Sequence, residues 1–128
     1  MPPTEVRAFR QVDGRVPIQD WLNDLKARKP EAYEKCLARI LELADLGHEM
    51  RRPHSDYLRD GIHELRAKLG RVQYRVLYFF YAQHQAALSH GLIKPGRAVP
   101  PREIDTAVAR RNQVLKDPDR YTADIDLE

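Results

Sequence analysis

A single arginine stands in the most hydrophobic stretch of the sequence. Arg75 lies within Val72–Tyr81, a run of β-branched and aromatic residues that predicts a central strand covered on both faces over much of its length. A guanidinium in such a strand needs a charged or polar partner. Either Arg75 is a structural arginine paired with Glu64 or Asp60, or it faces an anionic ligand, and the pattern alone leaves both possibilities open.

The basic residues are concentrated in one part of the chain. Residues 51–116 contain 13 Lys or Arg against 5 Asp or Glu, whereas residues 1–50 contain 8 against 9 and residues 117–128 contain 1 against 5. A basic segment of this kind suits a polyanion, most often nucleic acid. A merely solvated basic surface is equally compatible with the formal net charge of only +3.

Composition sets the outer limits of the fold and of its chemistry. A chain of 128 residues, 42% of them hydrophobic, predicts one compact domain. Cys36 is the only cysteine, so no internal disulfide can form, and neither a signal peptide nor a membrane-spanning run is recognisable. These features predict a soluble cytoplasmic protein without membrane contact. The histidines show no ligand spacing with Cys36 or with one another, so we expect no metal and no cofactor.

The strands that would position Arg75 form a meander. Turn signals separate three runs with strand character, Ile62–Ala67, Val72–Tyr81 and Ala86–Ile93, and a half-buried strand over Val6–Arg10 precedes them. We therefore expect a small, mostly antiparallel four-stranded sheet. Arg66 and Arg75 should lie on one face of this sheet or at its rim.

Three helices complete the expected α+β fold. Apolar residues at helical spacing predict a helix from Pro17 to about Lys26 and a second from Pro30 to a stop at Gly47, which together form a hairpin on one face of the sheet. A third helix should span Arg102–Leu115. The residues expected to face the sheet from the second and third helices include Tyr33, Leu37, Ile40, Leu41, Ala44, Ile104, Ala107, Val108 and Leu115.

Two polar segments complete the expected organisation. His48–Asp60 reads as a loop that crosses from the helical hairpin to the sheet and adds Arg51 and Arg52 to its rim. The domain is expected to cover residues 1–116. An acidic tail without detectable periodicity follows at residues 117–128 and is expected to be disordered.

Four short motifs occur in an order that is typical of a known family. They are His63-Glu64-Leu65-Arg66, Gln73-Tyr74-Arg75-Val76-Leu77-Tyr78-Phe79, His90-Gly91-Leu92-Ile93-Lys94, and Pro101-Arg102-Glu103-Ile104 followed by Ala107. In this order they resemble the RelE/ParE superfamily of toxins from bacterial type II toxin–antitoxin pairs, and most closely its phage-derived, HigB-like branch. The matched motifs cover roughly half of the chain, and none of them would be specific alone.

The resemblance implies a RelE-like fold and an endoribonuclease of the mRNA interferase type. Such a toxin cleaves mRNA on the ribosome without a metal, because the ribose 2′-hydroxyl attacks the adjacent phosphate. The expected partners are mRNA, the ribosome and a cognate antitoxin, which we expect to be a helix-turn-helix protein encoded by the neighbouring gene.

The same resemblance implies roles for individual residues. Arg75 and Arg66 would hold the phosphate with paired guanidinium donors, and Lys94 would add a charge from the end of the last strand. His90 is the first candidate for proton transfer, with Tyr78 and Glu64 as alternatives. The residues expected to contact RNA are Arg97, Arg102, Arg110, Arg51 and Arg52.

Three positions depart from the pattern of the better-known ribonucleases of this superfamily. Those proteins carry two lysines around the first strand of the meander and a tyrosine in the last helix, where this sequence has Ile62, Glu64 and Asp105. Two other functions therefore stay open. The chain could be a ParE-like toxin that inhibits DNA gyrase without catalysis, or a phage-related nucleic-acid-binding accessory protein.

Overall fold

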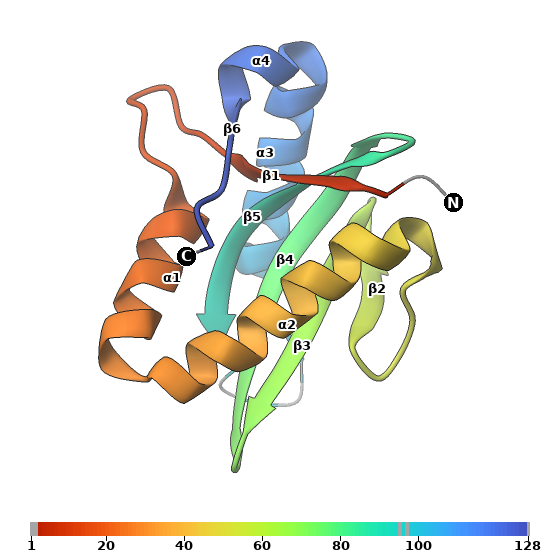
Figure 1. Cartoon of the computed structure of the whole chain (residues 1–128). Coiled ribbons are helices and arrows are strands. Elements are labelled where there is room, and N and C mark those ends of the chain that lie inside the picture. Colours follow the sequence, from red (N-terminus) through yellow and green to blue (C-terminus); the bar gives the residue numbers. More distant parts are fainter. Residues whose placement is uncertain (1–2, 95, 97, 128) are drawn as a thin grey trace.

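The structure is a computed structural model that describes residues 3–94, 96 and 98–127. Within these residues the chain forms an α+β fold with a mixed six-stranded sheet and four helices (Figure 1). In chain order the elements are β1 (Glu5–Phe9), α1 (Pro17–Arg28), α2 (Pro30–Leu46), a 3-10 turn η1 (Gly47–Glu49), β2 (Ser55–Arg59), β3 (Ile62–Leu69), β4 (Val72–Ala82), β5 (Gln85–Ile93), α3 (Pro101–Lys116), α4 (Pro118–Tyr121) and β6 (Thr122–Ala123).

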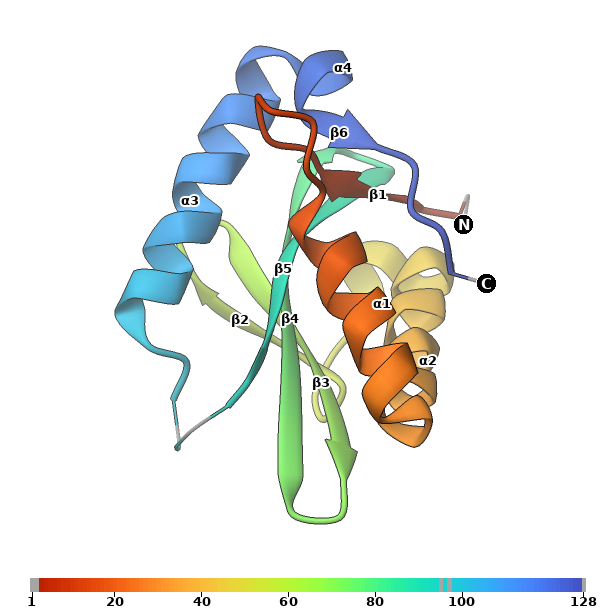
Figure 2. The ribbon, with the colours of Figure 1, turned by 90° about the vertical axis from the view of Figure 1, so that its left-hand side faces the viewer.

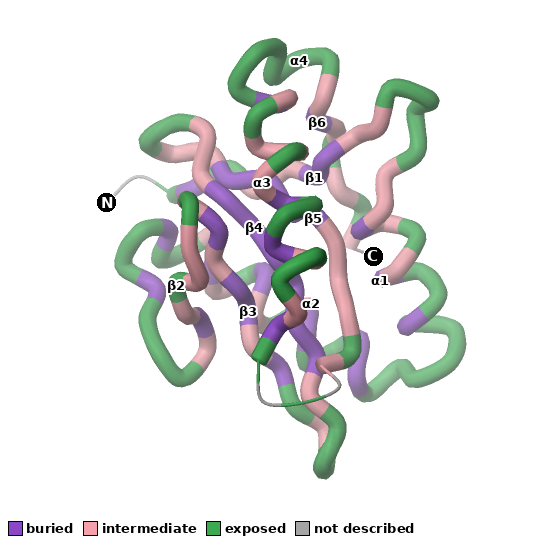
Figure 3. Tube along the Cα trace, turned by 180° about the vertical axis from the view of Figure 1, so that it is seen from behind, coloured by how far each residue is buried: buried purple, intermediate pink, exposed green. Residues whose placement is uncertain are grey.

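The sheet separates two helical layers. Its strand order is β2-β3-β4-β5-β1-β6, in which β1 runs parallel to β5 and the other neighbouring strands are antiparallel. Viewed along the sheet, α1 and α2 lie on one side and α3 on the other (Figure 2). The central strand β4 is buried along most of its length (Figure 3).

The helical hairpin begins and ends as the sequence predicts. Pro17 and Pro30 occupy the first turns of α1 and α2, where a missing N–H is tolerated, and Gly47 follows α2 with a φ of 54°. The hairpin packs closely on β5 at one point. A side chain at Gly91 would collide with the indole ring of Trp21, so glycine is required there for α1 to approach the sheet.

The larger hydrophobic core lies between the sheet and the helical hairpin. It includes Ile18, Leu22, Ile40, Leu43, Leu65, Val76, Tyr78 and Leu88. One predicted member of the α2 stripe is wrong, because Leu41 is 55% exposed and Leu43 is fully buried in its place. The predicted stripe contained Leu41 but not Leu43, and packing against the sheet decides between the two leucines.

A smaller core lies beneath α3 on the opposite face. It is built around Phe9, Ile62, Leu77, Phe79, Ala87, Ile104, Ala107 and Val114. Leu115 was expected on the apolar side of this helix but is 46% exposed, and Val114 is buried instead. Arg75 belongs to this α3 face, since it shares the face of Leu77 and Phe79.

The strand count differs from the expected four. Residues 55–59 lie within the predicted loop but form β2, which pairs antiparallel with β3 from Ser55 opposite Leu65 to Arg59 opposite Ile62. The second additional strand is β6, whose two residues pair with the end of β1. Together with the parallel pairing of β1 and β5, these strands make the sheet six-stranded and mixed.

The C-terminal segment is docked rather than disordered. The Nε of Arg7 donates to Thr122 Oγ1 at 3.1 Å, and the guanidinium of Arg7 also pairs with Asp124. Further along, the hydroxyl of Tyr33 donates to the carbonyl oxygen of Leu127 at 2.8 Å, and Ile125 packs against the larger core. The acidic residues of this segment therefore belong to a stretch of chain that is ordered: β6 pairs with β1, and Asp126 hydrogen-bonds to Gln19 of α1.

None of the helices in the described part of the chain combines the length and the apolar character needed to cross a bilayer.

Candidate functional site

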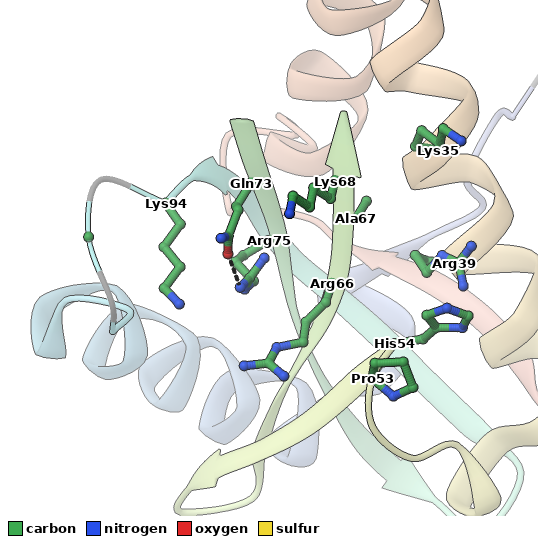
Figure 4. Close-up of a pocket in the computed structure, with 11 residues that line it drawn as sticks. Lys35, Arg39, Pro53, His54, Arg66, Ala67, Lys68, Gln73, Arg75 and Lys94 are labelled. Atoms are coloured by element: carbon green, nitrogen blue, oxygen red, sulfur yellow. Dashed lines mark hydrogen bonds between the residues drawn. The ribbon is translucent and has the colours of Figure 1, made fainter. Parts of the chain in front are cut away.

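A cavity of about 690 Å³ opens at the end of the sheet where β3 and β4 extend past β2. The residues that line it come from α2, from the segment before β2, from β3 and β4, and from the chain after β5. They are Lys35, Arg39, Pro53, His54, Arg66, Ala67, Lys68, Gln73, Arg75, Lys94 and Gly96 (Figure 4). Among these described residues six are Lys or Arg and none is acidic, so the cavity has a positive potential suited to an anion.

Arg75 forms the floor of this cavity. Its side chain is only 5% exposed, and two of its nitrogens donate to Gln73 Oε1 at 2.6 Å and to the carbonyl oxygen of Tyr74 at 3.2 Å. Its Nε lies 2.9 Å from Oε1 of the buried Glu64, which sits on the neighbouring strand. Burial lowers the pKa of Arg75, and the Glu64 carboxylate partly opposes this effect.

The contact between Glu64 and the two arginines is electrostatic rather than a well-aligned hydrogen bond. Arg66 Nε lies 3.4 Å from Glu64 Oε2. Among the described residues, Glu64 Oε1, Arg66 Nε and Arg75 Nε are buried atoms that lack a hydrogen-bond partner of good geometry. Two guanidinium groups thus share one carboxylate, which leaves this cluster with a net positive charge next to the cavity.

Lys94 completes the cluster from the end of β5. Its backbone N–H donates to the carbonyl oxygen of Gln73 at 2.8 Å, which fixes the start of the following loop beside β4. The pKa of Lys94 is lowered by desolvation and by the positive charges of Arg75 and Arg66, against the opposing effect of Glu64. A phosphate bound among these three cations would relieve their mutual repulsion.

The helix side of the cavity carries a second set of polar residues. Glu42 of α2 accepts hydrogen bonds from Arg39 at 2.7 Å and from His54 Nδ1 at 2.9 Å. Arg39 and His54 lie on the opposite side of β3 from Arg66 and Arg75 (Figure 4). The cavity therefore wraps around the exposed edge of β3, and His54 is the only imidazole among its described lining residues.

His90 lies on the same face as Arg75 but in a different environment. Its Nε2 lies 2.9 Å from Glu103 Oε1 of α3, and its Nδ1 lies 2.8 Å from Ser89 Oγ. Burial lowers the pKa of His90 more than Glu103 raises it, so the neutral ring would donate from Nε2 and accept at Nδ1. Ser89 is fully buried, and His90 does not line the cavity.

The arginines expected to contact RNA lie in several places. Arg110 is turned inward, donating to the carbonyl oxygen of Ser89 at 3.0 Å and stacking on Phe9. Arg102 is 81% exposed at the start of α3. Arg97 falls outside the described residues.

Arg51 and Arg52 lie in the segment before β2. Arg51 donates to the carbonyl oxygen of His48 at 2.6 Å, which ties its guanidinium to the end of η1. Arg52 is exposed and pairs with Asp56 at 3.0 Å. Neither residue lines the basic cavity, although the adjacent Pro53 and His54 do.

The two alternative proton-transfer candidates are both buried. Burial raises the pKa of Tyr78, whose hydroxyl lies 2.6 Å from Ser55 Oγ on the face covered by the helical hairpin. Glu64 is buried against Arg66 and Arg75 and is not among the residues that line the basic cavity.

Several cavity residues escaped the sequence analysis. Gln73 holds Arg75 in place, and Lys35, Arg39, Lys68 and His54 line the cavity. Because side chains alternate along a strand, Gln73 lies on the same face as Arg75, and this pattern could have predicted Gln73 as a cavity residue. The contributions of α2 and of the segment before β2 depend on tertiary packing. In the described part of the chain no group of three or more His, Cys, Asp or Glu gathers in a way that could hold a metal ion.

Comparison with known proteins identifies the family. No curated protein matches the sequence significantly. A family model described as phage-derived protein Gp49-like (DUF891) matches residues 20–112, which include most of the helical hairpin, the meander and most of α3. Since this match covers well over half of the sequence, the chain belongs to the phage-derived Gp49-like family.

Proposed function

We propose that the chain is the toxin of a type II toxin–antitoxin pair, of the HigB-like branch of the RelE/ParE superfamily, and that it is an endoribonuclease that cleaves mRNA on the ribosome. Membership of the Gp49-like family is consistent with such a toxin. The observation that carries the proposal is the basic cavity, with six cationic and no acidic residues in its described lining.

The cavity supplies the electrostatic part of the reaction. In metal-independent cleavage the ribose 2′-oxygen attacks the adjacent phosphorus, the bond from phosphorus to the 5′-oxygen breaks, and a 2′,3′-cyclic phosphate and a 5′-hydroxyl are formed. Negative charge accumulates on the phosphorane oxygens during this step. Arg66 and Lys94 would contact these oxygens, while the buried Arg75 would act mainly by its charge and by positioning Arg66 through Glu64.

Proton transfer requires a general acid or base within the cavity. His54 is the imidazole in the described lining, and Glu42 binds its Nδ1 and thereby orients the ring. It would take the proton of the 2′-hydroxyl or donate one to the departing 5′-oxygen. His90 would instead support the fold through Glu103 and Ser89.

The expected antitoxin would silence the site by covering it. An acidic segment that enters the basic cavity would neutralise Arg66, Lys68 and Lys94 and would exclude the message at the same time. We expect this antitoxin to be the product of the adjacent gene and to carry a helix-turn-helix domain.

The deciding experiment uses purified protein, translating ribosomes and an end-labelled message. We expect cleavage that leaves a 5′-hydroxyl, and we expect a message with a single 2′-deoxynucleotide at the mapped site to resist cleavage there. Intact messages combined with inhibited supercoiling by purified DNA gyrase would establish the ParE-like alternative. Protein that affects neither reaction but binds nucleic acid would support the accessory function.

A further inference from the structure

A second cavity lies close to the basic one but has a different character. It has a volume of about 450 Å³ and lies on the face of the sheet that carries the helical hairpin, next to the end of α2. Its lining comes from η1, the segment that follows it, and strands β2, β3 and β4. The lining residues are Gly47, His48, Met50, Arg51, Arg52, Ser55, Asp56, Tyr57, His63, Tyr78 and Phe80.

Flat rings dominate this aromatic cavity. His48 stacks on Phe80 with ring centroids 3.6 Å apart and planes inclined by 19°. His63 stacks on Tyr78 at 5.1 Å, and Tyr57 contacts His63 edge-on at 5.1 Å. Since His48 is exposed and Phe80 covers one face of its imidazole, the other face is available to a planar ligand.

The rings are held in place before any ligand binds. The hydrogen bond between Tyr78 and Ser55 joins β4 to β2 at the back of the cavity, and His48 Nε2 lies 3.1 Å from the carbonyl oxygen of Gln83. The pKa of His63 is lowered, first by burial and then by the neighbouring His48, so its ring stays uncharged at neutral pH. The interior is therefore preorganised and aromatic, and its rings are uncharged at His63, Tyr57, Tyr78 and Phe80 while Asp56 pairs with Arg52 at the edge.

The rim of the aromatic cavity is cationic. Arg52 is largely exposed, and its pairing with Asp56 leaves most of the guanidinium in solvent. Arg51 lines the same cavity one residue earlier. A planar apolar interior beside exposed guanidinium groups matches the two parts of a nucleotide, which are a flat base and an anionic phosphate.

The two cavities meet at one short segment. Arg51 and Arg52 line the aromatic cavity, Pro53 and His54 line the basic cavity, and Ser55 and Asp56 return to the aromatic cavity. The two linings adjoin within residues 52–54, so a chain of nucleotides that crosses these residues passes directly from one cavity to the other.

We propose that the aromatic cavity binds one unpaired nucleobase of single-stranded RNA, whose backbone continues over residues 52–54 into the basic cavity. The proposal rests on the proposed function, since it makes the same RNA the ligand of both cavities. An aromatic side chain of a partner protein could stack on the same rings, but it carries no phosphate to pair with Arg51 and Arg52.

The first test maps binding without cleavage. The ring signals of His48, His63 and Tyr57 are followed by NMR during titration with 5′-AMP or 5′-CMP, and with ribose 5-phosphate as the control that lacks a base. We expect the mononucleotides to shift all three rings and ribose 5-phosphate to leave them unchanged. Mononucleotide shifts confined to the basic cavity would overturn the proposal.

The second test uses matched variants and a fully 2′-O-methylated hexanucleotide, which cannot be cleaved because its 2′-oxygens are blocked. Losing one stacked base typically weakens binding by roughly tenfold or more, so His48→Ala should have an effect of this size. His48→Phe, which keeps a ring on Phe80, should bind within about threefold of the unchanged protein, as stacking is sequence-tolerant and needs only a flat face. Equal binding by His48→Ala would refute the base site.

Arg52 has a counterpart elsewhere on the surface that serves as a control. Arg28 is likewise exposed and pairs with an aspartate four residues away, but it lies on α1 and lines neither cavity. Arg52→Ala should weaken hexanucleotide binding by several-fold and reduce its salt dependence, whereas Arg28→Ala should not. Equal effects of the two variants would show that only nonspecific charge acts at Arg52 and would overturn its place in the site.

The two proposals fail in distinguishable ways. If the protein cleaves the message but mononucleotides shift NMR signals only in the basic cavity, the ribonuclease proposal is supported and the base-site proposal is refuted. If mononucleotides shift the ring signals of the aromatic cavity but no message is cleaved, the base-site proposal is supported and the ribonuclease proposal is refuted. Rings that respond to the purified antitoxin but not to mononucleotides would assign the aromatic cavity to a protein side chain instead of RNA.

Discussion

The face of the sheet that carries α3 holds two polar clusters with opposite properties. The edge cluster consists of Glu64, Arg66, Arg75 and Lys94, and it has excess positive charge and buried atoms without hydrogen-bond partners among the described residues. The covered cluster consists of Ser89, His90, Glu103 and Arg110, in which both imidazole nitrogens have partners beneath α3.

The two clusters differ in how well their charged and polar groups are paired. We expect a binding site where positive charge is left uncompensated, and a structural network where each polar group has a partner. A Ser-His-Glu sequence of contacts looks catalytic, yet its serine is fully buried and its members satisfy one another. The edge cluster has the less familiar composition, but three of its members line the basic cavity and its net charge is positive. Substitutions in the two clusters should therefore produce different combinations of lost stability and lost activity.

The largest effect is expected at Arg75. Arg75→Ala would leave Glu64 buried without its nearest cation and should reduce the free energy of unfolding by about 3–5 kcal/mol, besides abolishing cleavage. Denaturant unfolding measures the first effect and message cleavage the second. The double variant Arg75→Met with Glu64→Leu should recover most of the stability but none of the activity. Recovered activity in that variant would show that neither charge takes part in the reaction.

Arg66→Ala should separate activity from stability. Arg66 lies at the rim of the cavity, and the loss of one transition-state donor typically costs on the order of a hundredfold to a thousandfold in rate. The melting temperature should change little, because Arg75 continues to neutralise Glu64. Lys68→Ala removes a charge from the same strand and cavity and serves as the comparison for nonspecific electrostatics. Equal losses in the two variants would contradict a specific role for Arg66.

The two histidines provide the sharpest contrast between the clusters. His54→Asn should slow cleavage by roughly a hundredfold or more, because a general acid or base is lost. His90→Gln should leave cleavage within about threefold and lower the melting temperature instead. A reversal of these two results would make His90 the proton-transfer group and would return the covered cluster to the active site.

The smallest expected effect concerns pH and stability. The folded protein holds the pKa of His90 below its unfolded value of about 6.5, so the unfolded chain binds this proton first as the pH falls. The free energy of unfolding should therefore decline below about pH 6.5, by at most about 1.4 kcal/mol per pH unit for one histidine. Chemical denaturation between pH 5 and pH 8 should give a flatter profile for His90→Gln. Because the pKa of His63 is also lowered, the His63→Gln variant must be measured beside it.

The fold was largely predictable wherever periodicity was strong. The helical hairpin, the meander and α3 follow from apolar spacing and from Pro17, Pro30 and Gly47. Strand β2 was missed because its sequence, Ser-Asp-Tyr-Leu-Arg, carries little hydrophobic alternation within a run of charged residues. Strand β6 was missed because two residues give no periodic signal, and its pairing with β1 is decided by long-range contacts.

The candidate site was predictable only in part. Placing Arg66 and Arg75 on one face needed nothing more than alternation along two neighbouring strands. The competing expectation that Arg75 pairs with Glu64 describes a contact that the structure contains, and the two ideas are compatible because Glu64 is shared with Arg66. No pattern could place His54 in the same cavity as Lys94, since the segment before β2 and the end of β5 are far apart in the sequence and only tertiary packing makes both line it.

The position of β1 also bears on when this fold can form during synthesis. Strand β1 occupies the sheet between β5 and β6, so its two neighbours lie roughly 80 and 115 residues further along the chain. While the ribosome is still translating the meander, α1 and α2 expose an apolar surface that has no sheet to cover it. The last pairing becomes possible only after Ala123 has left the exit tunnel. The apolar surface of the helical hairpin is therefore exposed on the nascent chain until the later strands have emerged.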